Sequence, residues 1–392
     1  MTGTPMSSVL SGIEAQLREI WATPAAPGEP MKSRVVTMNL VVVAGSLEVA
    51  ERYRPVLDEV TQGTPARAIL VALDPTASQA SLEGDATAVC PVVPYGGPQV
   101  VCSELVRLVA RGAACARVSS AVDALLVPEI PTVLVWLGRV HVDDPVFHDL
   151  AVDAQRVVLD TEYTSFSSLL SLARWAHGRR GRPHVADLSW TRLSTWQELT
   201  ARFFDDPRLR AHAHRIDRLS ITQASEAGAK VGPEASLFLG WLATRLQWKT
   251  EHLGGVLRFL RPDGGRVQVV LATVPRPTGV APDALAAVAF EATEGGVHVR
   301  GSITRNLGSG RLGEPAGGLA DSHPMTQTID ADVLTWRLEV DGAPPLEQTV
   351  RLGANRGARL LERTIHRPPQ DAALEAAVAF ADELYEDGLT AG

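Results

Sequence analysis

One stretch of this 392-residue sequence has the glycine spacing with which dinucleotide-binding proteins bind a pyrophosphate. Gly308, Gly310 and Gly313 match the pattern G-x-G-x-x-G. That pattern binds a cofactor where its glycines lead from a strand into a helix, because the helix N-terminus then faces the phosphates. Here residues 314–318 read Glu-Pro-Ala-Gly-Gly, so no helix begins. We predict a flexible hairpin loop at this stretch.

The turn at Gly45 and Ser46 is a second candidate for anion binding. It lies between a predicted strand and a predicted helix, where backbone N–H groups can meet a phosphate. A single glycine is typical of any strand-to-helix turn, and Ser46 as N-cap, with Glu48 nearby, explains these residues without a ligand. The alternative function is a nucleotide- or sugar-phosphate-binding enzyme or sensor, with its ligand at the carboxyl ends of the strands.

The usual signatures of catalysis are missing from the sequence. It contains no P-loop, no H-E-x-x-H zinc motif and no G-x-S-x-G nucleophile motif. One segment gathers five residues that could hold a divalent metal: His141, Asp143, Asp144, His148 and Asp149. A polar loop leading into a capped helix explains the same residues. We therefore predict no metal, no cofactor and no catalytic site, and expect a protein that is not an enzyme.

The three cysteines, Cys90, Cys102 and Cys115, are odd in number and have no C-x-x-C spacing. Neither a disulfide framework nor a zinc site is indicated by this pattern. We predict buried, reduced thiols, with a redox role as the alternative.

Tryptophan and arginine gather in one segment in a way typical of a binding surface. Trp190, Arg192 and Trp196 lie within seven residues at the start of a predicted helix, residues 191–204, which Ser194 or Thr195 can cap. Trp and Arg are the residue types most enriched at the energetic centres of protein interfaces. The alternative is that these side chains pack the seam between the two halves of the chain.

The composition of the chain argues against two classes of partner, nucleic acids and membranes. The net charge of −8 argues against nucleic acid, which is bound by clustered Lys and Arg. The longest apolar runs fall short of the ~20 residues that a membrane span needs. The first thirty residues do not read as a signal peptide, so we expect a cytoplasmic protein without a membrane partner.

The elements that position these residues fall into an N-terminal helix with a tether, residues 1–31, and two domains. Over residues 32–178, apolar strands alternate with helical patterns, which predicts a mainly parallel α/β sheet covered on both faces, Rossmann-like but without the glycine fingerprint. The strands are expected at residues 35–43, 67–73, 87–93, 132–137 and 156–160, and the helices at 46–61, 98–112, 118–127 and 165–177.

Residues 179–392 show a different pattern, which predicts an α+β domain with an antiparallel sheet. Alternating strands at residues 256–260, 267–272, 286–292, 297–304 and 335–340 are followed or joined by tight Gly turns. A helix at residues 233–247 and a closing helix at residues 369–384 are expected to back this sheet.

Three segments together resemble the glucose-6-phosphate dehydrogenase assembly protein family, the OpcA family. Asp187, Trp190, Arg192 and Trp196 match its Asp-Leu-x-Trp-x-Arg-Leu-x-x-Trp-Arg pattern. Residues 127–136, ending in Trp136, resemble the family's Pro-Asp-Leu-Pro-Val stretch, and residues 237–246 resemble its second helix. Glu129, Val135 and Gln197 depart from the pattern.

The resemblance implies a non-catalytic partner that binds glucose-6-phosphate dehydrogenase, aids its assembly into an active oligomer and acts as an allosteric effector in the oxidative pentose phosphate pathway. From the local gathering of Trp and Arg, we expect Trp190, Arg192 and Trp196, with Trp136 and Asp187, to belong to or directly support the partner-binding surface. A scaffold for another oligomeric enzyme is a further alternative.

Overall fold

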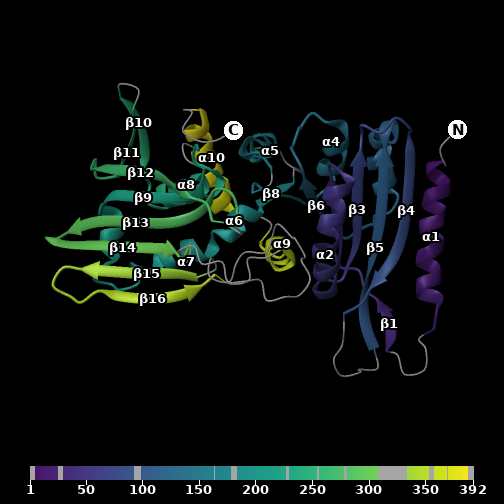
Figure 1. The fold of residues 1–392 in the computed structure, drawn as a ribbon, viewed down its shortest axis with the longest axis horizontal. Helices are drawn as coiled ribbons and strands as arrows, with labels where there is room; N and C mark the ends of the chain where they lie inside the picture. Colours follow the sequence, from purple (N-terminus) through teal and green to yellow (C-terminus); the bar gives the residue numbers. More distant parts are fainter. Residues whose placement is uncertain are drawn as a thin grey trace. The chain divides into compact units, whose positions relative to one another are not determined.

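A computed structural model describes residues 5–24, 30–91, 99–162, 164–177, 183–226, 229–253, 256–277, 280–307, 333–352, 357–368 and 370–386. The glycine stretch 308–313 lies outside the described residues. The chain divides into two compact units (Figure 1). Unit 1 consists of Met1–Leu188 and Gly357–Asp371, and unit 2 of Ser189–Arg356 and Ala372–Gly392. A domain boundary at residues 178–179 stays a prediction, and the segment Gly357–Asp371, which we had placed in the second domain, belongs to unit 1.

Unit 1 is built on an eight-stranded sheet in the order β1-β5-β3-β2-β6-β7-β8. Two strands share one edge of β5: β1 pairs with its first part, Gln99–Cys102, and β4 pairs with the remainder, Ser103–Arg111. Every pair is parallel except β4 with β5, which confirms the predicted mainly parallel sheet. The strands are β1 (Met31–Arg34), β2 (Met38–Ala44), β3 (Ala66–Asp74), β4 (Ser81–Val89), β5 (Gln99–Arg111), β6 (Thr132–Leu137), β7 (Arg156–Leu159) and β8 (His184–Asp187).

The central strands of this sheet are buried along nearly their whole length, as expected when helices cover both faces. The first crossover helix begins at Ser46, whose hydroxyl accepts a hydrogen bond from the Val49 N–H at 3.2 Å, so the predicted N-cap is confirmed. In Figure 1, α1 lies outside β4. The helices of unit 1 are α1 (Met6–Ala22), α2 (Leu47–Gly63), the 3-10 helix η1 (Gly112–Arg117), α3 (Val118–Asp123), α4 (Pro145–Val152), α5 (Phe166–Ala176) and α9 (Gly357–Ile365).

The helix predicted at residues 98–112 is wrong, because this segment is β5. Its Val101, Leu105 and Leu108 also fit a helical spacing, which caused the error. The strand lies between two neighbours and is buried on both faces, so its apolar residues show no period of two. The strand predicted at residues 87–93 lies earlier, at Ser81–Val89.

A buried carboxylate ties three elements to β5. Glu104 is fully buried, and its Oε2 lies 2.7 Å from the Arg67 Nε of β3. Its Oε1 accepts a hydrogen bond from the Trp21 indole N–H of α1 at 2.7 Å and lies 2.7 Å from the Arg34 Nε of β1. Pairing of this kind offsets the cost of removing a carboxylate from water.

Unit 2 contains a second eight-stranded sheet, in the order β10-β11-β12-β9-β13-β14-β15-β16. All its pairs are antiparallel except β12 with β9. The three predicted hairpins are confirmed, with Gly264, Gly295, Gly296 and Gly342 at positive φ in their turns. The strands are β9 (Ile216–Ser225), β10 (Lys249–Leu253), β11 (Val256–Leu260), β12 (Arg266–Pro275), β13 (Ala284–Glu294), β14 (Val297–Arg305), β15 (Val333–Val340) and β16 (Leu346–Arg351).

Helices pack on one face of this sheet. On that face Phe203 stacks on Trp336 of β15 at 4.6 Å between ring centroids and meets Phe290 of β13 edge-on at 5.0 Å. Gly240 allows α8 and α10 to pack closely, since a Cβ there would lie 2.4 Å from the Ala377 carbonyl oxygen. The helices are α6 (Leu188–Arg192), α7 (Ser194–Arg202), the 3-10 helix η2 (Arg210–Arg215), α8 (Pro233–Arg245) and α10 (Ala372–Glu386).

Candidate docking site

Two of the five expected partner-binding residues lie in unit 1, and both are buried. Trp136 of β6 is 8% exposed; its indole N–H donates to the Arg139 carbonyl at 3.1 Å and its ring meets Phe147 edge-on. Asp187, at the end of β8, is fully buried and accepts hydrogen bonds from the Thr161 N–H at 3.0 Å and the Thr161 hydroxyl at 2.8 Å. The Asp187 carboxylate therefore anchors the turn that follows β7.

The other three residues lie in α6 and α7 of unit 2. Trp190 is 3% exposed, Arg192 is 7% exposed and Trp196 is 1% exposed. The Arg192 guanidinium donates to the Ser189 hydroxyl at 2.8 Å, and the Arg305 guanidinium lies over the Trp196 ring at 5.9 Å from its centroid.

The predicted capping of this segment is wrong. Ser194 is the first residue of α7, and Leu193, which makes no side-chain cap, precedes it. The Ser194 hydroxyl instead donates to the Thr191 carbonyl of α6 at 2.7 Å. Two short consecutive helices thus replace the single helix expected at residues 191–204. The Ser194 side chain bonds to a carbonyl of the preceding helix and does not cap the N–H groups of its own helix.

Burial determines what these five side chains can do. A side chain that is less than a tenth exposed offers a partner almost no surface, so direct contact would require the segment to open. Their burial leaves a positioning role, in which they hold the surrounding surface in shape. Because Trp and Arg are enriched both at interfaces and in such packed segments, sequence alone did not separate the two roles.

The strand-to-helix turn at Gly45 forms internal hydrogen bonds. The Gly45 N–H donates to the Leu137 carbonyl of β6 at 3.4 Å, and the Ser46 hydroxyl is occupied in capping α2. This turn lies at the carboxyl end of β2, beside β6, where doubly wound sheets bind nucleotides. A phosphate at this point would have to compete with the Leu137 carbonyl for the Gly45 donor.

The histidine- and aspartate-rich segment 141–149 caps and supports a helix. Asp144 is the N-cap of α4, its Oδ1 accepting from the Val146 and Phe147 N–H groups, and the Asp149 carboxylate accepts from the Ser119 hydroxyl at 3.2 Å. Across the part of the chain that the structure describes, no group of three or more His, Cys, Asp and Glu side chains could hold a metal ion.

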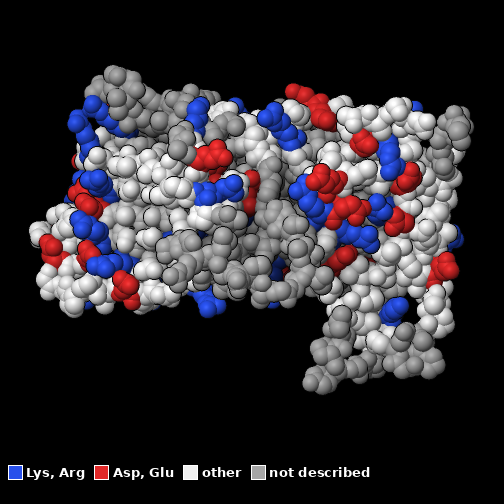
Figure 2. Space-filling view, viewed as in Figure 1, with Lys and Arg blue, Asp and Glu red and all other residues white. Residues whose placement is uncertain are grey.

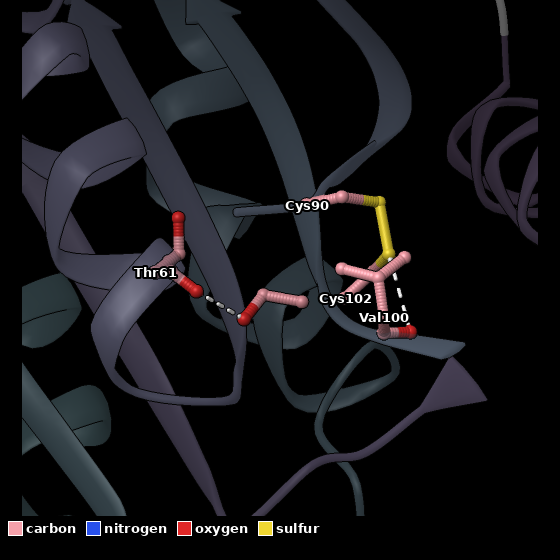
Figure 3. Close-up of a disulfide and its surroundings, with 5 residues drawn as sticks. Thr61, Cys90, Val100 and Cys102 are labelled. Atoms are coloured by element: carbon pink, nitrogen blue, oxygen red, sulfur yellow. Dashed lines mark hydrogen bonds between the residues drawn. A yellow bond between two sulfur atoms is a disulfide. The ribbon is translucent and has the colours of Figure 1, made fainter. Parts of the chain in front are cut away.

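The prediction that all three cysteines are reduced is wrong for two of them. Cys90 and Cys102 form a disulfide (Figure 3). Cys115 is a free, buried thiol whose pKa is raised by burial. The pairing follows from the hairpin register: Val89 of β4 lies opposite Ser103 of β5, so the next residues outward are Cys90 and Cys102. This register depended on β5 being a strand, which the sequence analysis missed.

We expect the disulfide to stabilise unit 1 by about 2–3 kcal/mol, as closure of a loop of this length implies. The protein unfolded without reductant should show one reactive thiol, and the reduced protein three. Thiol titration and thermal unfolding with and without dithiothreitol measure both effects, with Cys115→Ser as the control that keeps the disulfide. Three reactive thiols without reductant would contradict the assignment.

Charges on the described surface are mixed. Figure 2 shows Lys and Arg interspersed with Asp and Glu on the face in view, without a continuous basic area. Among the described helices, none is both long and apolar enough to cross a membrane.

The comparisons with known proteins match both halves of the chain to one family. Residues 57–174 match the model described as the glucose-6-phosphate dehydrogenase subunit N-terminal domain, and residues 183–378 match the C-terminal domain of the same subunit. The chain is 32% identical over 233 residues to a protein of Nostoc punctiforme that bears the name of an OxPP cycle protein, OpcA, covering 56% of this chain and 48% of that protein. A protein of Synechocystis with the same name is 28% identical over 231 residues, covering 56% and 47%. The match thus spans about half the length of these curated relatives.

Solved structures show a weaker likeness. An oxidoreductase from Sinorhizobium meliloti is 14% identical with a TM-score of 0.45, covering 91% of this chain and 94% of that one. The 3-ketoreductase KijD10 from Actinomadura kijaniata is 9% identical with a TM-score of 0.43, covering 88% and 95%.

Proposed function

This chain belongs to the OpcA family of glucose-6-phosphate dehydrogenase assembly proteins, and we propose that it is a non-catalytic factor that binds that dehydrogenase and promotes its active oligomer. The observation that carries the proposal is the match of two consecutive domain models, in order, over residues 57–174 and 183–378. Both models are described as domains of a glucose-6-phosphate dehydrogenase subunit.

The proposal includes an allosteric effect on the dehydrogenase. A bound protein can change an enzyme's activity only if it binds the enzyme's states with different affinities, so any gain must saturate as binding saturates. We expect the protein to act in the cytoplasm, with neither nucleic acid nor a membrane among its partners.

We further propose that Trp190, Arg192 and Trp196 support a docking surface of unit 2 from beneath, and that Trp136 and Asp187 support the surface of unit 1 around them. Their burial favours this role over direct contact. Side chains that lock a segment in one shape reduce the entropy that the segment loses when a partner binds.

Glucose-6-phosphate dehydrogenase that co-purifies with the tagged full chain from its own cells, identified by mass spectrometry, would support the proposal. Recovery of a different oligomeric enzyme in its place would reject it in favour of the scaffold alternative.

The alternative, a nucleotide or sugar-phosphate sensor, makes the opposite prediction for the protein alone. Because the Gly45 N–H and Ser46 hydroxyl are engaged internally, we expect millimolar NADP, NADPH or glucose 6-phosphate to leave the melting temperature unchanged. We also expect no reduction of NADP with glucose 6-phosphate. A ligand at a hundred times its Kd would add about 2.7 kcal/mol of stability, so a clear upward shift would favour the sensor.

A further inference from the structure

We propose that the open face of the unit 2 sheet is a self-association surface on which a second copy of this chain docks about a two-fold axis. This face, opposite α7, is made by side chains that alternate with the buried ones along β9, β13, β14 and β15. The inference goes beyond the proposed function and does not depend on it.

The first feature of the face is a charged row of alternating sign. The strand register places four residues in line across four neighbouring strands: Arg218, Glu291, Arg300 and Glu339. Arg300 lies 3.2 Å from Glu291 and 3.7 Å from Glu339, and the three side chains are 52%, 32% and 37% exposed in that order. These charges are paired within the sheet yet remain accessible.

The second feature is a flat area beside that row. The next row across the strands is Ser220, Ala289, Ser302 and Arg337, and the row after it is Thr222, Ala287, Thr304 and Thr335. Seven of these eight side chains are Ala, Ser or Thr, and Arg337 is the exception. Small side chains allow two sheets to approach face to face at about 10 Å.

The rows match themselves under one symmetry operation. The axis runs parallel to the strands, above the open face and between β13 and β14. It exchanges β13 with β14 and β9 with β15, so that each row faces the same row of the second copy. Glu291 then faces Arg300 of the second copy, and Arg218 faces Glu339 of the second copy. In the flat rows, Ala289 faces Ser302 and Thr222 faces Thr335. Isologous interfaces require this kind of self-complementarity.

Charge balance is the argument for a second copy as the occupant. The chain carries a net charge of −8, so two copies repel each other on average. The charged row itself is neutral, because Arg218 and Arg300 balance Glu291 and Glu339. Opposite charges in register favour association and orient it.

The test is the mass of the full chain in solution, measured by sedimentation between about 1 and 100 µM, where we expect a dimer. Arg300→Glu puts like charges at both symmetry-related contacts and should raise the dimer Kd at least about tenfold. Arg300→Glu combined with Glu291→Arg restores opposite charges between these two positions, both within the chain and across the axis, so it should restore dimerisation. Arg52→Glu, with the same charge change on unit 1, is the matched control and should leave the Kd unchanged.

Arg218→Glu provides a second, independent variant at the end of the row, in case Arg300→Glu disturbs folding as judged by circular dichroism. A protein that is monomeric at every concentration would overturn the proposal, as would a dimer whose Kd neither variant changes. A monomer whose Arg300→Glu variant loses binding to glucose-6-phosphate dehydrogenase would also overturn it, because the face would then serve that enzyme.

Discussion

Replacing Arg156 with methionine should lower the free energy of unfolding of unit 1 by about 3–5 kcal/mol. The Arg156 guanidinium, only 6% exposed, donates to four backbone carbonyls at the end of α9 and just beyond it: Thr364 at 2.6 Å, Ile365 at 2.8 Å, Arg367 at 2.7 Å and Pro368 at 2.8 Å. A helix leaves its last carbonyls without intrahelical partners, and a cation at this end also interacts favourably with the helix dipole.

Methionine retains the volume of the side chain but removes every donor, so the four carbonyls lose this partner in a buried place. Burial lowers the pKa of Arg156, but a guanidinium stays protonated in a folded protein, so the effect should not depend on pH near neutrality. Denaturant unfolding followed by circular dichroism measures the loss. Arg156→Lys retains the charge but not the planar, forked guanidinium. Its free energy of unfolding should lie between those of the wild type and Arg156→Met.

The matched control is Arg52→Ala, which removes an exposed i,i+4 ion pair with Glu48 and should cost no more than about 0.5 kcal/mol. An Arg156→Met loss below about 1 kcal/mol would show that α9 is not held to unit 1 by this residue.

Replacing Trp196 with alanine should destabilise unit 2 by about 3–5 kcal/mol, the usual cost of deleting a buried tryptophan. Trp196 is 1% exposed in α7, and the Arg305 guanidinium lies over its ring. The change leaves a large cavity and removes this cation–π contact. Thermal unfolding measures the loss, and Leu346→Ala on β16, where the side chain is 57% exposed, is the control with little expected effect.

Trp196→Phe separates positioning from direct docking. Phenylalanine retains most of the buried ring, so if Trp196 supports the surface from beneath, this variant should bind glucose-6-phosphate dehydrogenase with nearly full affinity. If the indole itself contacts the enzyme, affinity should fall by more than about tenfold while stability is largely retained, since truncating a binding hot spot costs ~2 kcal/mol. That outcome would contradict the positioning role.

The elements with a clear sequence period were predicted well. The strand that became β2, the cap at Ser46 and the three Gly-turn hairpins all appear in the structure, because each depends on local pattern and turn chemistry. The sequence also pointed to the family through residues 187–196.

Two of the errors share one cause, which is that burial on all sides removes local patterning. β5 was read as a helix because it is buried along most of its length, and the Cys90–Cys102 disulfide was missed with it. The four-fold capping by Arg156 joins residues more than two hundred positions apart, and no local pattern marks such a contact. The open sheet face could not be recognised because its charged row exists only once four strands are in register.

A kinetic titration of the purified glucose-6-phosphate dehydrogenase from the same organism with this protein tests whether the chain promotes the enzyme's active oligomer. Initial rates of NADP reduction are measured against glucose 6-phosphate at increasing concentrations of the added chain, with the dehydrogenase's mass followed in parallel. We expect a gain in rate, or a lower apparent substrate requirement, that saturates at a fixed ratio of the two proteins and accompanies formation of a larger complex. Unchanged rates and an unchanged mass at saturating concentration would contradict it.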